Sequence, residues 1–341
     1  MKTLTSLLLV MLSSSTLAQR ITTISVPSAQ RLSKTDPQAA RALLESMGVK
    51  YLWKMDGSDV IVNGSEITVT DFMDHSIARG PSDLVTVQTC PSSGDDFVLF
   101  SRPNPDYPVG GSLLVQEDFP HSRLEHTSEF TIGGWFKQYP ALFSDFRYLE
   151  PRYLAGGYMP ALSRYLPASA TEDSGMEWMA HLTSERLYFN INRGFTGQND
   201  MNQQLPWWAD TYGTCYDGRH FECWHYVSIS VNPAQNTVQF VIVRQSAGRG
   251  YNRDGNDFIS TGITDARLNN TPIPVLRGAE LRIGAHQTGG THGIIRGLYF
   301  ARKALSPSES KALADYTAPS KKGFLCSGAR LQPRTGGNST P

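Results

Sequence analysis

The residues best suited to bind a ligand lie between Gly197 and Tyr212, a polar stretch that we interpret as an inserted loop. Flat aromatic rings can cover the C–H face of a sugar, and planar amides and carboxylates can hydrogen-bond its hydroxyls. An alternative is that at least one of the two adjacent tryptophans only pins the loop onto the sheet. The predicted ligand-binding residues are Asn199, Asp200, Asn202, Gln204, Trp207, Trp208, Asp210 and Tyr212.

A second short segment has the chemistry of a calcium site. Asp254, Asn256 and Asp257 place hard oxygen ligands close together, which is what Ca²⁺ prefers. Phe258 occupies the fifth position, so the segment is not an EF-hand loop. A solvated turn would use the same residues for their backbone tolerance, and calcium is therefore only one of two interpretations.

The acidic residues argue against the commonest catalysis on a β-sandwich. Residues two apart on a strand share a face, where one carboxylate can act as nucleophile and the other as acid. None of the 31 acidic residues is two positions from another, and signatures of serine hydrolases, zinc proteases and nucleotide-binding loops are absent. We predict no catalytic residue. The pairs closest to that spacing on a turn-like segment are three apart, at Asp56/Asp59, Asp71/Asp74 and Asp254/Asp257.

The first 18 residues have the order of a secretory signal peptide. Lys2 provides a positive start, Leu4 to Leu12 an apolar stretch, and small residues lead to Ala18. The apolar stretch is shorter than the ~20 residues that a membrane span needs. The sequence therefore predicts a secreted protein.

In a secreted protein the four cysteines are expected to form disulfides, because these bonds form in oxidising compartments. Four cysteines allow three pairings. Only a short loop separates Cys215 from Cys223, which favours the pairs Cys215–Cys223 and Cys90–Cys326. In a eukaryotic host, Asn63, Asn269 and Asn338 would also be glycosylation sites.

Composition limits the partners. The chain has 31 basic and 31 acidic residues and a net charge of zero, so bulk charge cannot attract nucleic acid. No later segment is apolar for long enough to span a membrane. The expected partner is a glycan or another component of an extracellular surface.

The elements that must position these residues are mostly short strands. The 30 glycines and 20 prolines favour a turn-rich, all-β chain. Helices are expected only at Gln38–Met47 and after Ser306, and residues 232–236 read as a hairpin loop. The expected strands are Tyr51–Met55, Glu66–Phe72, Asp83–Gln88, Phe97–Phe100, Ser112–Gln116, Glu129–Gln138, Glu177–Leu182, Arg186–Asn192, Trp224–Val231, Thr237–Arg244, Glu280–Ile283 and Gly293–Ala301.

Many short strands with few helices predict an all-β, two-sheet antiparallel jelly-roll sandwich with one short N-terminal and one late C-terminal helix. We divide the chain into a signal peptide (1–18), an N-terminal lead with a short helix (19–50), the sandwich (51–318) and a disordered C-terminal tail (319–341).

Four segments in order resemble the laminin-G-like, concanavalin A-like lectin/glucanase family. They are, more loosely, Leu52–Gly57 with Val69–Asp71, then Glu129–Lys137, Trp224–Val227, and a closing segment of Leu281–Gly284, Gly293–Phe300 and Ala304-Leu305-Ser306. The resemblance covers residues 51–316 and implies a sandwich that binds ligands, in many relatives with calcium, at its rim. The chain departs from the family pattern by long insertions between Lys137 and Trp224.

These observations together predict a secreted, non-catalytic recognition protein that binds carbohydrate. Two alternatives stay open. One is a polysaccharide hydrolase or lyase whose carboxylates come from separate strands, and the other is a structural or adhesive extracellular protein.

Overall fold

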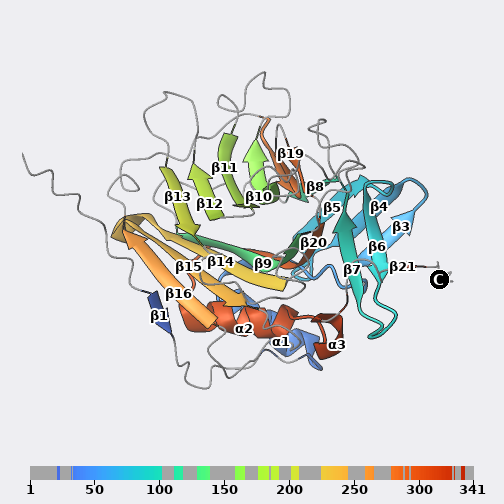
Figure 1. Ribbon diagram of the computed structural model, residues 1–341, viewed down its shortest axis with the longest axis horizontal. Coiled ribbons are helices and arrows are strands. Elements are labelled where there is room, and N and C mark those ends of the chain that lie inside the picture. Colours follow the sequence, from blue (N-terminus) through green and yellow to red (C-terminus); the bar gives the residue numbers. More distant parts are fainter. Residues whose placement is uncertain are drawn as a thin grey trace, which may run out of the picture.

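The computed structural model describes residues 21–23, 32, 34–101, 111–117, 129–138, 158–165, 176–183, 186–191, 201–206, 224–244, 258–264, 278–286, 289–291, 293–324, 326 and 332–334. These residues form two large antiparallel sheets and three helices (Figure 1). The prediction of an all-β, two-sheet sandwich is confirmed.

One sheet has ten strands. Along it they run β1-β16-β15-β14-β9-β20-β7-β6-β21, and β2 also pairs with β20. Their bounds are β1 Ile21–Thr23, β2 Val49–Trp53, β6 Val85–Thr89, β7 Asp96–Phe100, β9 Phe130–Gln138, β14 Trp224–Asn232, β15 Thr237–Arg244, β16 Phe258–Thr264, β20 Gly293–Ala301 and β21 Gln332–Pro333.

The other sheet has nine strands in the order β13-β12-β11-β10-β17-β8-β5-β4-β3, and β18 pairs separately with β19. The bounds are β3 Val60–Asn63, β4 Glu66–Thr70, β5 Ser76–Pro81, β8 Leu113–Glu117, β10 Tyr158–Tyr165, β11 Met176–Thr183, β12 Arg186–Ile191, β13 Met201–Pro206, β17 Glu280–Ile283, β18 Ala285–His286 and β19 Gly289–Gly290.

The ten-stranded sheet is covered on both faces. Along β9, Phe130, Ile132 and Phe136 point into the core between the sheets, because every second residue of a strand shares a face. Trp135 points the other way, into a second core. That second core packs the sheet against three helices, α1 Pro37–Ser46, α2 Pro307–Thr317 and α3 Lys321–Phe324, which lie below the sheet in Figure 1.

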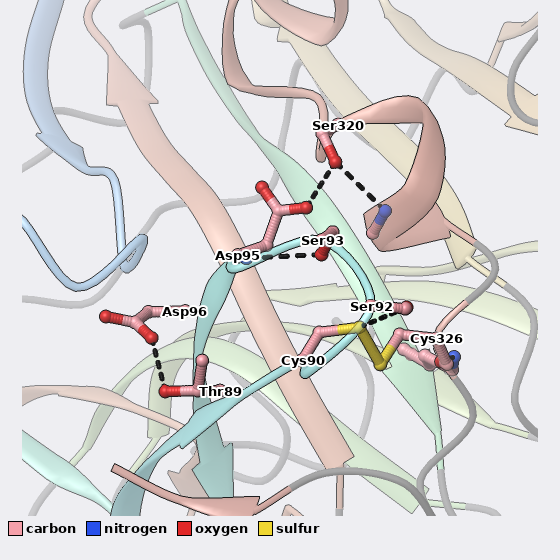
Figure 2. The surroundings of a disulfide bond; sticks show 10 residues. Thr89, Cys90, Ser92, Ser93, Asp95, Asp96, Ser320 and Cys326 are labelled. Atoms are coloured by element: carbon pink, nitrogen blue, oxygen red, sulfur yellow. Dashed lines mark hydrogen bonds between the residues drawn. A yellow bond between two sulfur atoms is a disulfide. The ribbon is translucent and has the colours of Figure 1, made fainter. Parts of the chain in front are cut away.

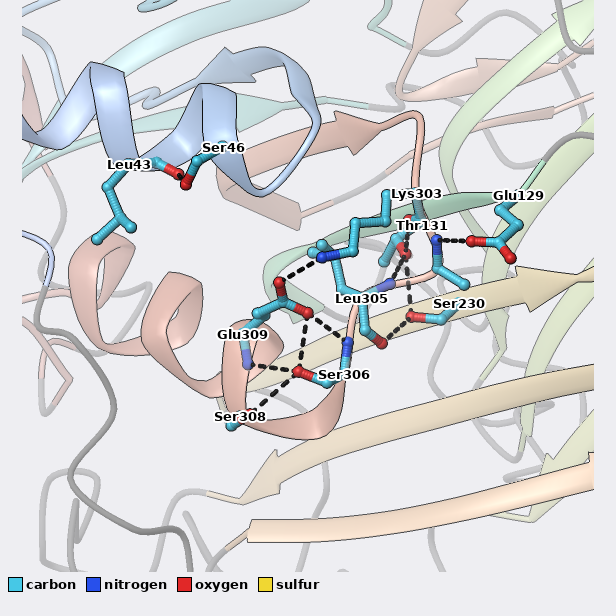
Figure 3. Close-up of polar contacts among 11 residues, drawn as sticks. Leu43, Ser46, Glu129, Thr131, Ser230, Lys303, Leu305, Ser306, Ser308 and Glu309 are labelled. Carbon is cyan, nitrogen blue, oxygen red and sulfur yellow. Dashed lines mark hydrogen bonds and ion pairs between the residues drawn. The ribbon is translucent and has the colours of Figure 1, made fainter.

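Local sequence explains the ends of these elements. Asn232 caps a 3₁₀ turn, Pro233–Gln235, and Asn236 takes the left-handed φ of 54° that turns the chain from β14 into β15. Helix α2 begins with a capping box: the Ser306 hydroxyl accepts the N–H of Glu309, whose carboxylate accepts the N–H of Ser306 (Figure 3). The predicted hairpin loop and late helix are both confirmed.

The first part of the expected C-terminal tail is ordered, so that expectation is wrong for these residues. The predicted Cys90–Cys326 disulfide is present and joins the end of β6 to the residues after α3 (Figure 2). Phe324 packs edge-on against Trp135, with ring centroids 5.2 Å apart. Ser320 hydrogen-bonds Asp95 across the same junction. A covalent link and a buried aromatic ring outweigh the polar composition that suggested disorder.

Candidate functional site

The outer face of the nine-stranded sheet is the candidate site. Helices cover the ten-stranded sheet, whereas no described helix lies on the outer face of the nine-stranded one (Figure 1). In these strands the apolar residues of β4, β5 and β8 point into the core, at Ile67, Val69, Ala78, Leu113 and Val115. The alternate residues therefore form the open face.

The strand register brings residues from all nine strands into one row on this face. Each residue of the row is the direct cross-strand partner of the next. The row reads Ile61, Thr68, Arg79, Leu114, Arg282, Ser163, Met179, Asn190 and Asn202. Beside it, His181, Tyr188 and Gln204 form a shorter parallel row across β11, β12 and β13.

Arg282 is the best-fixed polar group of the row. Its Nε and Nη2 donate to Glu280 Oε2 at 2.8 and 2.6 Å, and its Nη1 donates to Ser112 Oγ at 3.3 Å. The two charged side chains are 24% and 31% exposed. The guanidinium is thus held in place while part of it faces solvent, as a group that orients a ligand must be.

A second ion pair lies nearer the β3 end of the face. Arg79 and Glu66 are 3.9 Å apart, and their side chains are 44% and 52% exposed. Solvent screens such a pair, so it contributes little to stability and leaves both groups able to exchange partners.

Two of the sequence-predicted binding residues lie on a strand of this sheet, at register positions of the two rows. Asn202 and Gln204 lie on β13, opposite Asn190 and Tyr188 of β12. Residues 201–206 were expected in a loop, and that expectation is wrong, because all six pair in register with β12 as an edge strand. An edge strand with polar residues on its open face looks like a loop in sequence.

The other predicted sites lie outside the described residues and stay predictions. This group contains the binding residues Asn199, Asp200, Trp207, Trp208, Asp210 and Tyr212, the calcium ligands Asp254, Asn256 and Asp257, the pair Cys215–Cys223, and the sequons at Asn269 and Asn338. The third sequon is described: Asn63 is exposed where β3 turns into β4.

Sequence reasoning missed Arg282 and Glu280, although the signal was available. The strand Glu280–Ile283 was predicted with the correct bounds, and Leu281 and Ile283 are its buried residues. Period-two alternation then places the two charged residues together on the opposite face.

A groove of about 310 Å³ opens at the β3–β4 end of this face. Ile61 and Thr70 belong to the open face and also line the groove. Its other lining residues are Arg41, Lys54, Ser58, Asp59, Asp71, Phe72 and Asp74. Sequence reasoning did not predict it, because α1, the β2–β3 connection and the β4–β5 connection meet there only in the folded chain.

Two further features were sought among the described residues. No group of three or more His, Cys, Asp or Glu side chains there has the arrangement of a metal site. No helix in that part of the chain is long and apolar enough to cross a membrane.

Comparison with known proteins does not identify a family for this chain. No protein-family model matches the sequence, and no curated protein matches it significantly. The botulinum neurotoxin DC binding domain, solved with rat synaptotagmin II, has 13% identity and a TM-score of 0.40 over 79% of this chain and 52% of its own. This chain thus spans about half the length of that domain.

Two other solved structures are similar at the same level. The CBM40 domain of Ruminococcus gnavus IT-sialidase, bound to α2,3-sialyllactose, has 13% identity and a TM-score of 0.34 over 55% of this chain and 82% of its own. Trypanosoma rangeli sialidase has 11% identity and a TM-score of 0.40 over 79% and 33%. All three likenesses are too distant to indicate a ligand or an activity for this chain.

Proposed function

We propose that this protein is a secreted, non-catalytic glycan-binding protein of the laminin-G-like type, which holds a carbohydrate chain on the open face of the nine-stranded sheet. The observation that carries the proposal is the row of residues that crosses all nine strands. It combines amide, hydroxyl and guanidinium groups with apolar residues such as Leu114 and Met179. Sugars present the matching combination of hydroxyls and C–H surface.

The size of the row supports an extended ligand. Nine strands spaced by ~4.8 Å give a row about 38 Å long. One sugar ring would occupy a small part of it, so the proposed ligand is an oligosaccharide or polysaccharide chain. The segment 199–212, which includes β13, would complete the site with Asn199, Asp200, Trp207, Trp208, Asp210 and Tyr212.

The chemistry favours a sugar over nucleic acid. The chain has a net charge of zero, and the fixed cation of the row, Arg282, is already paired with Glu280. Such a face offers directed hydrogen bonds without the surplus of positive charge that nucleic acid needs. The buried Cys90–Cys326 disulfide supports secretion, because such bonds persist in oxidising compartments.

A glycan array followed by calorimetric titration of the best oligosaccharide tests the proposal. The double variant Asn202→Ala/Gln204→Ala removes two amides from the open face and should weaken binding about tenfold or more. Gln203→Ala is the matched control, because Gln203 lies on the same strand but on the other face of the sheet. Trp207→Ala and Trp208→Ala test the adjoining segment.

Full binding by the Asn202/Gln204 double variant, or an equal loss in the Gln203 control, would place the ligand elsewhere. Release of reducing ends from the bound polysaccharide would show instead that the protein is an enzyme.

A further inference from the structure

In the groove at the β3–β4 end of the open face, two charged side chains form no ion pair with the other groove residues. Arg41 pairs with Asp74. Both oxygens of Asp71 accept backbone N–H groups, from Leu52 and Met73 at 2.7 and 3.0 Å and from His75 at 3.0 Å. Lys54 and Asp59 remain.

Lys54 is a half-buried ammonium group without a carboxylate partner. Its Nζ lies 3.9 Å from the centroid of the Phe72 ring and 5.6 Å from that of Tyr316. No carboxylate of the described residues lies within ion-pair distance of it. Burial is the largest influence on its pKa and lowers it. A bound anion would restore the stability that the ammonium loses by burial.

The charged groups around Lys54 do not supply that anion. Asp56 and Asp59 attract the ammonium, whereas Arg41 and Arg296 repel it. Asp56 accepts the N–H of Ser58 at 3.2 Å and lies 4.0 Å from Arg296.

Asp59 has one carboxylate oxygen that is buried without a hydrogen-bond partner. Its Oδ2 accepts the N–H of Met55 at 2.9 Å, while its Oδ1 is buried without a hydrogen-bond partner. Burial raises the pKa of this carboxyl to about 6. A buried carboxylate oxygen without a partner disfavours the ionised form, in agreement with the raised pKa of this carboxyl.

We propose that this groove is a subsite for one sugar unit that carries a carboxylate. Lys54 pairs with the carboxylate of the ligand, and the exposed side chain of Ile61 packs against ring C–H groups. Ile61 is 62% exposed, so its side chain is accessible for this contact.

Position and volume agree with this assignment, which rests on the proposed function. Ile61 and Thr70 connect the groove to the row on the sheet. About 310 Å³ is at the lower end of the roughly 300–1,000 Å³ range of small-molecule sites, which suits a single ring. The subsite would hold an acidic unit of a chain that the open face binds.

The test is calorimetric titration with methyl glucuronide and with its neutral counterpart, methyl glucoside. The wild-type protein should prefer the glucuronide, and Lys54→Met should weaken glucuronide binding about tenfold or more, since a hydrogen-bonded charge pair is lost. The matched control is Lys50→Met, because Lys50 is a half-buried cation of β2 that does not line the groove.

The pH dependence gives a second readout. An ionised Asp59 repels the ligand carboxylate, so glucuronide should bind about threefold more tightly at pH 5 than at pH 7.5. In Asp59→Asn the affinity for glucuronide should no longer depend on pH. At both pH values it should equal the tighter affinity that the wild-type protein has at pH 5.

The outcomes separate the two proposals. Equal affinity for the two glycosides, or equal losses in Lys54→Met and Lys50→Met, would overturn the subsite while a neutral oligosaccharide still binds the sheet. If the wild-type protein binds neither monosaccharide nor oligosaccharide, both proposals fall.

Discussion

At the scale of single residues, buried hydroxyls join the ten-stranded sheet to the chain that enters α2. Thr131 of β9 is fully buried; its Oγ1 donates to the carbonyl of Lys303 at 2.7 Å and accepts the N–H of Leu305 at 2.9 Å (Figure 3). Ser230 of β14 donates to the carbonyl of Leu305 at 3.1 Å. These bonds satisfy backbone groups that would otherwise be buried without partners.

Thr131→Val should therefore destabilise the protein although it keeps the shape of the side chain. The N–H of Leu305 loses its acceptor, and a buried donor without a partner costs about 1–3 kcal/mol of unfolding free energy. Urea denaturation followed by circular dichroism measures the loss. Thr68→Val, on the open face, is the control and should change the midpoint little. A Thr131 variant as stable as the wild type would contradict this account.

Because of Asp59, the free energy of unfolding should change with pH in the mildly acidic range. Burial raises its pKa from 3.8 to about 6, so between these values the folded state holds a proton that the unfolded state has released. The stability contribution of this group is therefore fully present below pH 3.8 and is lost as pH rises through 6.

Asp59→Asn should raise the unfolding free energy at pH 7.5 by about 1 kcal/mol, a value below the full linkage figure because the residue keeps some solvent contact. Denaturation of both proteins at pH 3.5, 5 and 7.5 measures the difference, which should disappear at the lowest pH. Asp83→Asn, in the exposed β5–β6 turn, is the control. A difference that does not vary with pH would contradict the assignment.

At the scale of elements, the residues after α2 depend on one covalent link. Cys90 and Cys326 are 236 positions apart in sequence, and α3 lies directly before Cys326 (Figure 2). The Nζ of Lys137, a fully buried cation of β9, donates to the carbonyl of Cys326. The disulfide thus also fixes the acceptor of a buried charge.

Cys90→Ala/Cys326→Ala should lower the unfolding free energy by about 2–4 kcal/mol and should open the segment from residue 319 to proteolysis first. Limited proteolysis with mass spectrometry identifies the first cut. Ser320→Ala removes the bond to Asp95 but keeps the disulfide, and should have a smaller effect. An unchanged first cut in the double cysteine variant would mean that packing alone holds α3.

Sequence predicted the elements whose apolar residues alternate clearly. Glu280–Ile283 has the expected bounds, because its buried residues alternate with partly exposed ones. Gly293–Ala301 also has the expected bounds, although all nine of its residues are buried. Strand β10 was missed: Pro160 lies inside it, next to a register shift, and proline argues against a strand. Strand β13 was missed because its amides suggested a loop.

The candidate site was only partly predictable, because sequence patterns describe each strand separately. Local pattern can place Asn202 or Arg282 on a strand, but the register between distant strands decides that they share one row. The groove joins Arg41, Lys54 and Asp71, whose approach depends on how α1 packs beside β2. No spacing along the chain contains that information.

At the scale of the whole molecule, the two outer faces of the sandwich differ. Helices α1, α2 and α3 cover the ten-stranded sheet, so its polar residues, such as Ser228 and Thr131, bond within the protein. No described helix covers the nine-stranded sheet, and by register its row of cross-strand partners lies on the face opposite its buried residues. This asymmetry is the basis of the proposed function.

Hydrogen–deuterium exchange of the protein, free and saturated with the oligosaccharide that binds best on the array, tests the proposed function most directly. The account predicts slower exchange on binding in β10 to β13 and β17, the strands that carry the polar half of the row. Slower exchange confined to α1, α2 and α3 or to the ten-stranded sheet would contradict it, as would the absence of binding by any glycan.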